Sequence, residues 1–161
     1  MKNRVFNVVA LLAMLLPGLV TLAGCAETSQ AAKPEAAQSN NPFEPKHKVV
    51  IQVSSANPQV QTLALNNAHN LQQMLGMDNV KIVIVAYGPG LSILTKQSKF
   101  PERIQSLHAQ GIEFDACHNT MLAVKRKTGH LPKVLPGVKI VPAGVVRIME
   151  LQEKGWSYIR P

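Results

Sequence analysis

The chain has 161 residues, a formal net charge of +8 and only 4% aromatic residues. This length suits one ordinary globular domain with a real core. The positive charge would attract anions, but the basic residues are not interleaved with aromatic side chains that could stack bases, and no nucleic-acid-binding motif is present, so we exclude nucleic acid as a partner.

Residues 1–24 have the pattern of a secretory signal peptide. Lys2 and Arg4 form a short positive region, and an almost wholly apolar run of roughly 18 residues follows, ending in small residues. A run of this length is also close to that of a marginal transmembrane helix. The Pro17-Gly18 pair inside the run and the absence of a charged stop-transfer segment after it favour the signal peptide.

The signal ends in the tetrapeptide LAGC, residues 22–25, which resembles the lipobox of bacterial lipoproteins. The resemblance implies cleavage before Cys25 and lipidation of its thiol; the alternative is an ordinary secretory signal that contains a cysteine. Residues 25–46 are rich in Ala, Gln, Ser, Asn and Pro, so we interpret them as a flexible tether behind the lipid anchor. By the same resemblance, we expect a periplasm-facing lipoprotein of the cell envelope, and Ala26 in place of aspartate implies the outer membrane.

The folded domain is expected at residues 47–161, where apolar strands alternate with amphipathic helices. Strands are predicted at 48–55, 80–87, 112–117, 138–142 and 156–160. Helices are predicted at 58–75, 91–96, 101–110, from 119 or 120 to 128, and at 144–154. In the last helix, Val145, Ile148, Met149 and Gln152 are expected to face inward. This alternation predicts an α/β fold with a mainly parallel sheet and helices on both faces, a three-layer α/β/α arrangement.

In open parallel sheets, ligands gather outside the carboxyl ends of the strands. The residues that we expect to form this ligand or anion edge are Ser54, Ser55, Asn57, Tyr87, Gly88, Gly90, Asn119 and Gly144. Asn57 is also expected to cap the first helix. The Gly-Pro-Gly turn at 88–90 lacks the full spacing of a phosphate-binding loop, so a plain tight turn is favoured over an anion site.

Cys117 and His118 are the candidate catalytic residues. If Cys25 carries lipid, Cys117 is the only thiol of the mature chain and cannot form an intramolecular disulfide. It directly precedes a predicted helix, whose free N–H groups would stabilise a thiolate. His118 is adjacent, but neighbours on a strand face opposite sides, so the helix backbone is the better candidate for activating the thiol. The alternative is that Cys117 is core filler, because cysteine is often buried.

Neither a metal nor another cofactor is expected. The histidines show no spacing typical of metal ligands, no Ser/His/Asp arrangement can be identified, and Glu113 and Asp115 alternate on a predicted strand without forming an evident acid–base pair.

From residue 48 to 161 the chain resembles the DsrE/DsrF-like family of small sulfur-metabolism proteins, in particular its single-domain branch. The matching segments, in order, are KVVIQVSS, VKIVIVAYGPGLSIL, GIEFDACHNTM and VPAGVVRIMELQEKGWSYIRP. The resemblance implies a three-layer α/β/α domain with a five-stranded parallel sheet, assembled into homo-trimers or hexamers. It also implies that Cys117 carries sulfur as a persulfide and exchanges it with donor or acceptor proteins.

Three functions follow as hypotheses. The first is a thiol-based sulfur carrier that uses Cys117, at most a sulfurtransferase-like protein. The second is a non-enzymatic oligomeric envelope module that binds a small anion or a partner protein, consistent with a formal charge of +7 in the domain. The third is a redox sensor whose thiol oxidises reversibly. Characterised sulfur carriers of the family act in the cytoplasm, whereas export is predicted here.

Overall fold

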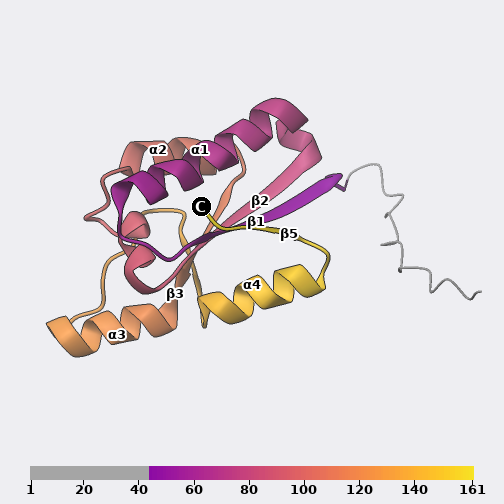
Figure 1. Ribbon diagram of the computed structural model, residues 1–161. Coiled ribbons are helices and arrows are strands. Elements are labelled where there is room, and N and C mark those ends of the chain that lie inside the picture. Colours follow the sequence, from indigo (N-terminus) through magenta and orange to yellow (C-terminus); the bar gives the residue numbers. More distant parts are fainter. Residues whose placement is uncertain (1–43) are drawn as a thin grey trace, which may run out of the picture. The chain divides into compact units, whose positions relative to one another are not determined.

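The computed structural model describes residues 44–161 (Figure 1). The predicted signal peptide, the predicted lipidation site Cys25 and nearly all of the predicted tether lie outside the described residues. Within residues 44–161, no helix combines the length and the hydropathy that a membrane span requires.

Strands and helices alternate along the described chain, as predicted. The strands are β1 (His47–Val53), β2 (Val80–Ala86), β3 (Glu113–Cys117), β4 (Lys139–Val141) and β5 (Ser157–Ile159). The helices are α1 (Pro58–Leu75), α2 (Pro101–Ala109), α3 (His118–Thr128) and α4 (Gly144–Glu153), with the 3-10 helices η1 (Met77–Asn79) and η2 (Gly88–Leu94).

The segment after β2 differs from the prediction. A short helix was expected at 91–96, but the chain enters a 3-10 helix already at Gly88 and leaves it at Leu94. Gly88 has a φ of 53°, a left-handed conformation that glycine adopts without steric cost, and Pro89 follows with its φ fixed near helical values. The Gly-Pro-Gly sequence therefore turns the chain directly into η2.

The sheet has the strand order β4-β3-β2-β1-β5, and all of its pairings are parallel. In Figure 1, α1 and α2 lie on one side of this sheet and α4 lies on the other, while α3 extends away from the end of β3. The expected α/β fold with a five-stranded parallel sheet is confirmed. All carboxyl strand ends share one edge, which is where Cys117 ends β3.

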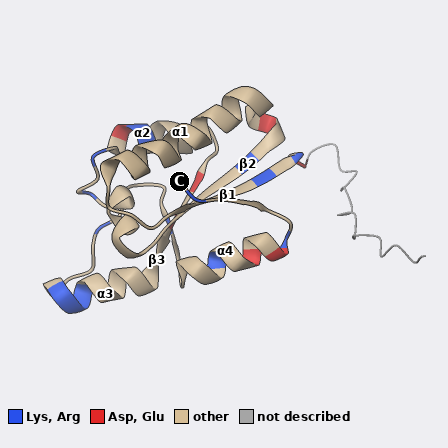
Figure 2. Cartoon of the chain, in the orientation of Figure 1, with Lys and Arg blue, Asp and Glu red and all other residues tan. Residues whose placement is uncertain are grey.

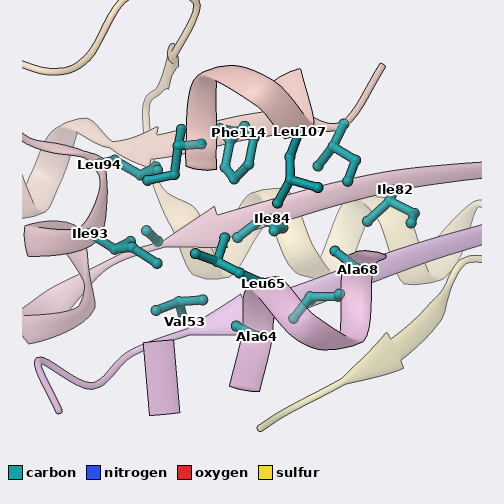
Figure 3. Close-up of a cluster of buried hydrophobic side chains, with 14 of the residues drawn as sticks. Val53, Ala64, Leu65, Ala68, Ile82, Ile84, Ile93, Leu94, Leu107 and Phe114 are labelled. Atoms are coloured by element: carbon teal, nitrogen blue, oxygen red, sulfur yellow. The ribbon is translucent and has the colours of Figure 1, made fainter. Parts of the chain in front are cut away.

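The larger core fills the space between the sheet and the α1–α2 side (Figure 3). Ile84 and Phe114 project from the sheet, Leu65 from α1 and Leu107 from α2, and none of them is more than 3% exposed. Burying an apolar side chain of this size stabilises the fold by roughly 1.5–3 kcal/mol. This core fixes the strands whose ends carry the candidate site.

The second core lies under α4 and is much smaller. The buried residues of this cluster are Val50, Val83, Val85, Ile148 and Leu151, and Tyr87 and Trp156 pack against it.

The inward face of α4 was predicted incorrectly. Ile148 is buried as expected, but Val145 and Met149 are 61% and 51% exposed, and Gln152 is exposed as well. The buried residues are Gly144, Ile148 and Leu151, which share one helical stripe. Gly144 heads this stripe because the absence of a side chain lets the helix end approach the sheet closely.

Candidate functional site

Cys117 ends β3 and at the same time occupies the N-cap position of α3. Its backbone is extended, with φ −72° and ψ 114°, and the residue is 5% exposed. Among residues 44–161 it is the free cysteine. Because side chains alternate along a strand, Cys117 lies on the same face of β3 as Glu113 and Asp115, the face covered by α4. The thiol is therefore nearly buried at the carboxyl edge of the sheet, between two helices.

The first turn of α4 packs directly against this cysteine. A Cβ atom placed on Gly144 would lie 3.2 Å from the Cβ of Cys117 and 3.1 Å from the Cβ of Tyr87. Such contacts are tighter than ordinary van der Waals packing, so glycine allows the close approach. As a result, the N-termini of both α3 and α4 lie beside the same sulfur, with N–H groups that have no partner inside their own helices.

These N–H groups change the acidity of the thiol. Burial alone would raise the pKa of Cys117, but the side chain of Thr120 and the backbone N–H groups of Gly144, Thr120 and Asn119 favour the thiolate and hold the pKa below its usual value. The N–H of Asn119 is shared, because it also donates to the carbonyl of Pro142 at 3.2 Å. The sulfur makes no regular capping hydrogen bond to α3. These N–H and hydroxyl groups therefore stabilise the thiolate of Cys117 more than they stabilise its neutral thiol.

The hydroxyl of Thr120 is oriented by the Gly-Pro-Gly turn. The N–H of Gly88 donates a hydrogen bond to Thr120 Oγ1 at 2.9 Å. With a lone pair of Oγ1 occupied in this way, the single hydroxyl hydrogen is available for donation to the thiolate of Cys117. Gly90 packs the same turn against the end of β1. A Cβ atom added to Gly90 would lie only 2.1 Å from the carbonyl oxygen of Val53, so this position requires glycine. The turn therefore supports the site through Thr120.

The predicted edge residues on the β1 side make local hydrogen bonds. Ser54 Oγ accepts from Gln52 Nε2 at 3.0 Å, and Ser55 Oγ accepts from the N–H of Asn57 at 3.1 Å. Asn57 caps α1 by accepting from the N–H of Gln59 at 2.9 Å. These side chains organise the end of β1 and the start of α1.

His118 is the first residue of α3 and is partly exposed. It is not among the groups that lower the pKa of the Cys117 thiol. The basic residues Lys125, Arg126 and Lys127 fill the last turn of α3, at the end of the helix that is remote from β3 (Figure 2). The backbone donors and Thr120 are therefore the groups that act on the sulfur.

Two residues of the C-terminal segment, Tyr158 and Arg160, lie near Tyr87, and sequence analysis did not assign either of them to the site. Tyr158 stands on β5 and donates its hydroxyl hydrogen bond to Gln52 Oε1 on β1. Burial raises the pKa of Tyr87; Tyr158 and Cys117 raise it further, and the positive charge of Arg160 lowers it. These groups thus influence one another electrostatically. The sequence carries no signal for this grouping, because it depends on the order of the strands in the sheet.

A charged cluster lies behind Cys117 on the same face of β3. Arg147 of α4 donates from Nε to Asp115 Oδ2 at 2.8 Å and from Nη2 to Glu113 Oε1 at 2.9 Å, and Lys139 Nζ donates to Glu113 Oε1 at 3.1 Å. Asp115 is fully buried. Burial raises the pKa of Asp115 to about 6, because the hydrogen bond from Arg147 only partly offsets burial and the nearby negative charge of Glu113.

Other kinds of site find little support in residues 44–161. No group of three or more His, Cys, Asp or Glu side chains is arranged to hold a metal ion there. Two open, apolar grooves follow α1, one beside Phe100 and one beside Ile159, and Cys117 lines neither of them. Among the described residues, the Cys117 thiol is therefore the strongest candidate for a reactive group.

Comparisons with known proteins agree with this architecture. A solved structure, the protein of unknown function MTH1491 from Methanobacterium thermoautotrophicum, is 34% identical, covers 71% of this chain and 99% of its own, and superposes with a TM-score of 0.64. No curated protein matches the chain. The model of the DsrE/DsrF-like family matches residues 47–161, so this chain belongs to the DsrE/DsrF-like family.

Proposed function

We propose that this protein is an exported, lipid-anchored sulfur carrier in which Cys117 bears the sulfur as a persulfide. The observation that supports this role most directly is the convergence of two helix N-termini and the Thr120 hydroxyl on one nearly buried thiol. The DsrE family is associated with sulfur relay, which supports sulfur as the cargo.

The proposed loading step needs no outside oxidant. The Cys117 thiolate attacks the outer sulfur of thiosulfate, a new S–S bond forms, the S–S bond of thiosulfate breaks, and sulfite leaves with the bonding electron pair. With a persulfide donor, the same attack releases the donor thiolate. In the unloading step, an acceptor thiolate attacks the outer sulfur of the Cys117 persulfide and regenerates the Cys117 thiolate.

The surroundings of Cys117 suit both species of this cycle. Backbone N–H groups and a hydroxyl stabilise a thiolate, and they can equally stabilise the negative outer sulfur of a persulfide. Arg160 supplies a positive charge near Tyr87, the neighbour of the thiol, and would attract an anionic donor. At 5% exposure, the thiol favours small donors over bulky ones.

Intact mass spectrometry tests the carrier role. After incubation with thiosulfate or a small persulfide, the wild-type domain is expected to gain about 32 Da, the mass of one sulfur atom, and a reductant should remove it. Cys117→Ser is the matched control and should gain nothing. An unmodified wild-type protein, or the same adduct on Cys117→Ser, would contradict the proposal.

The membrane anchor is tested separately on the full chain. In a bacterial host, the wild-type protein is expected in the membrane fraction with an acylated Cys25. Cys25→Ser should abolish the acylation and release the protein from the membrane. Wild-type protein in the soluble fraction, or acylation that persists in Cys25→Ser, would contradict lipid anchoring.

A non-enzymatic oligomeric module is the second candidate, and the surface of α4 favours it. Val145, Val146 and Met149 expose apolar surface on one helix, which is typical of a contact with another protein. We propose that copies of this chain associate as trimers or hexamers. Sedimentation of the soluble domain should show an assembly that Val145→Asp disrupts. If Cys117→Ala retained full function in cells, this candidate would replace the sulfur carrier.

A further inference from the structure

Arg147 connects the first turn of α4 to the strand that carries the thiol. Its backbone N–H closes that turn by donating to the carbonyl of Ala143 at 3.0 Å. Its guanidinium forms a fork, with Nε on Asp115 at 2.8 Å and Nη2 on Glu113 at 2.9 Å. The two carboxylates precede Cys117 by two and four residues on the same face of β3. One side chain therefore fixes the start of α4 against the strand segment that ends at the thiol.

The backbone just before α4 is also held, because the Pro142 carbonyl accepts from the Asn119 N–H at 3.2 Å, but few side chains hold the first turn itself. The apolar contacts of the helix come from Ile148 and Leu151, which lie in its second and third turns. In the first turn, Gly144 touches Cys117 and Tyr87 but has no side chain with which to anchor itself. Among the side chains of this turn, Arg147 is therefore the one whose ion pairs position the Gly144 N–H relative to the sulfur, together with the backbone connection from β4.

The cluster is poorly suited to a purely stabilising role. Asp115 is fully buried, and its Oδ1 atom has no hydrogen-bond partner among the described residues. A buried polar atom without a partner costs free energy, and buried ion pairs are often replaceable by apolar residues without loss of stability. The charged neighbours of Asp115 are Glu113 on the same strand and Arg147 on α4. On β4, Lys139 lies beside Asp115 but bonds to Glu113. On β2, the neighbour of Asp115 is the apolar Val85.

We propose that the ion pairs of Arg147 with Asp115 and Glu113 form a positioning clamp that holds the N-terminus of α4 at Cys117 and thereby sets the reactivity of the thiol. The clamp rests on the proposed role of Cys117 as a reactive thiol. Arg147 and Asp115 are positioning residues: they act on the sulfur through α4 and do not touch the sulfur donor.

The test is the pH dependence of Cys117 alkylation by iodoacetamide, followed by mass spectrometry. In Arg147→Gln, the midpoint of the rate profile should rise by at least about one pH unit, and alkylation at pH 7 should slow about tenfold. Lys139→Gln is the matched control. Lys139→Gln removes the same positive charge, and Lys139 also bonds to Glu113 Oε1, at 3.1 Å. However, Lys139 lies on β4, and its bond to Glu113 does not involve α4. Its profile should stay at the wild-type midpoint.

Arg147→Lys separates position from charge and serves if Arg147→Gln does not fold. Lysine keeps the positive charge but has one nitrogen in place of the fork, so a smaller rise of the midpoint is expected. A wild-type midpoint in Arg147→Gln, or an equal rise in Lys139→Gln, would overturn the clamp. If only Arg147→Lys folds, a wild-type midpoint together with a lower melting temperature would overturn it. Because alkylation does not require sulfur loading, a failed clamp and a failed carrier role give different results.

Discussion

Thr120→Val gives the sharpest test of how the thiol is activated. Valine keeps the shape of threonine and removes only the hydroxyl, which accepts from the Gly88 N–H at 2.9 Å and favours the Cys117 thiolate. A hydrogen bond to a charged group contributes about 1.5–3 kcal/mol, which corresponds to a thiol pKa higher by about 1–2 units. The Gly88 N–H also loses its acceptor, so the free energy of unfolding should fall by about 1–3 kcal/mol.

Two measurements separate these effects. The pH–rate profile of Cys117 alkylation reports the thiol pKa, and urea unfolding reports stability. Thr120→Ser retains the hydroxyl and should stay near wild type in the alkylation profile. If Thr120→Val lost stability but kept the wild-type thiol pKa, the hydroxyl would have only a structural role, and the assignment of Thr120 to the site would be refuted.

Three further substitutions test the support of the site. Because the pKa of Asp115 is raised to about 6, the folded protein binds this proton more tightly than the unfolded chain does, so Asp115 should make the free energy of unfolding fall as pH rises from about 4 to about 6. Glu113 acts in the opposite direction: burial raises its pKa, but the hydrogen bond from Lys139 and the positive charges of Lys139 and Arg147 lower it overall, so the stability that it contributes is lost as pH falls. Asp115→Asn should therefore leave a curve that rises more steeply over this range than that of wild type. Identical curves from urea unfolding would refute the assignment. Gly90→Ala should destabilise the domain by about 3 kcal/mol, since the added Cβ would lie 2.1 Å from a carbonyl oxygen. Gly88→Ala, at an open position with a φ of 53°, should destabilise it by only about 1–2 kcal/mol. Equal melting temperatures of the two variants would contradict this difference.

Most of the fold could be predicted because its signals are local. The buried strands β1 and β2 are continuous β-branched apolar runs, and α1 carries a capping asparagine, a proline at its start and a glycine at its end. Cys117 could be placed at the carboxyl edge of the sheet because it ends a strand and precedes a helix. Each of these inferences needs only a short stretch of sequence.

The remaining parts of the site depend on tertiary contacts. On α4, both the stripe with Val145 and Met149 and the stripe with Ile148 and Leu151 are apolar, so the pattern alone does not decide which one faces the sheet. The structure decides it through Gly144. The bond from Arg147 to Asp115 spans 32 residues and requires α4 to lie across β3, which no periodicity predicts.

The near-complete burial of Cys117 would act as a size filter. Thiol–disulfide exchange needs the attacking sulfur, the attacked sulfur and the leaving sulfur to approach a straight line, and a thiol that is 5% exposed offers that geometry only to compact reagents. Peptide-sized disulfides would therefore react slowly, while small inorganic sulfur anions would still fit. In the oxidising envelope proposed for this protein, such a filter would keep the thiol free of mixed disulfides without any resolving cysteine.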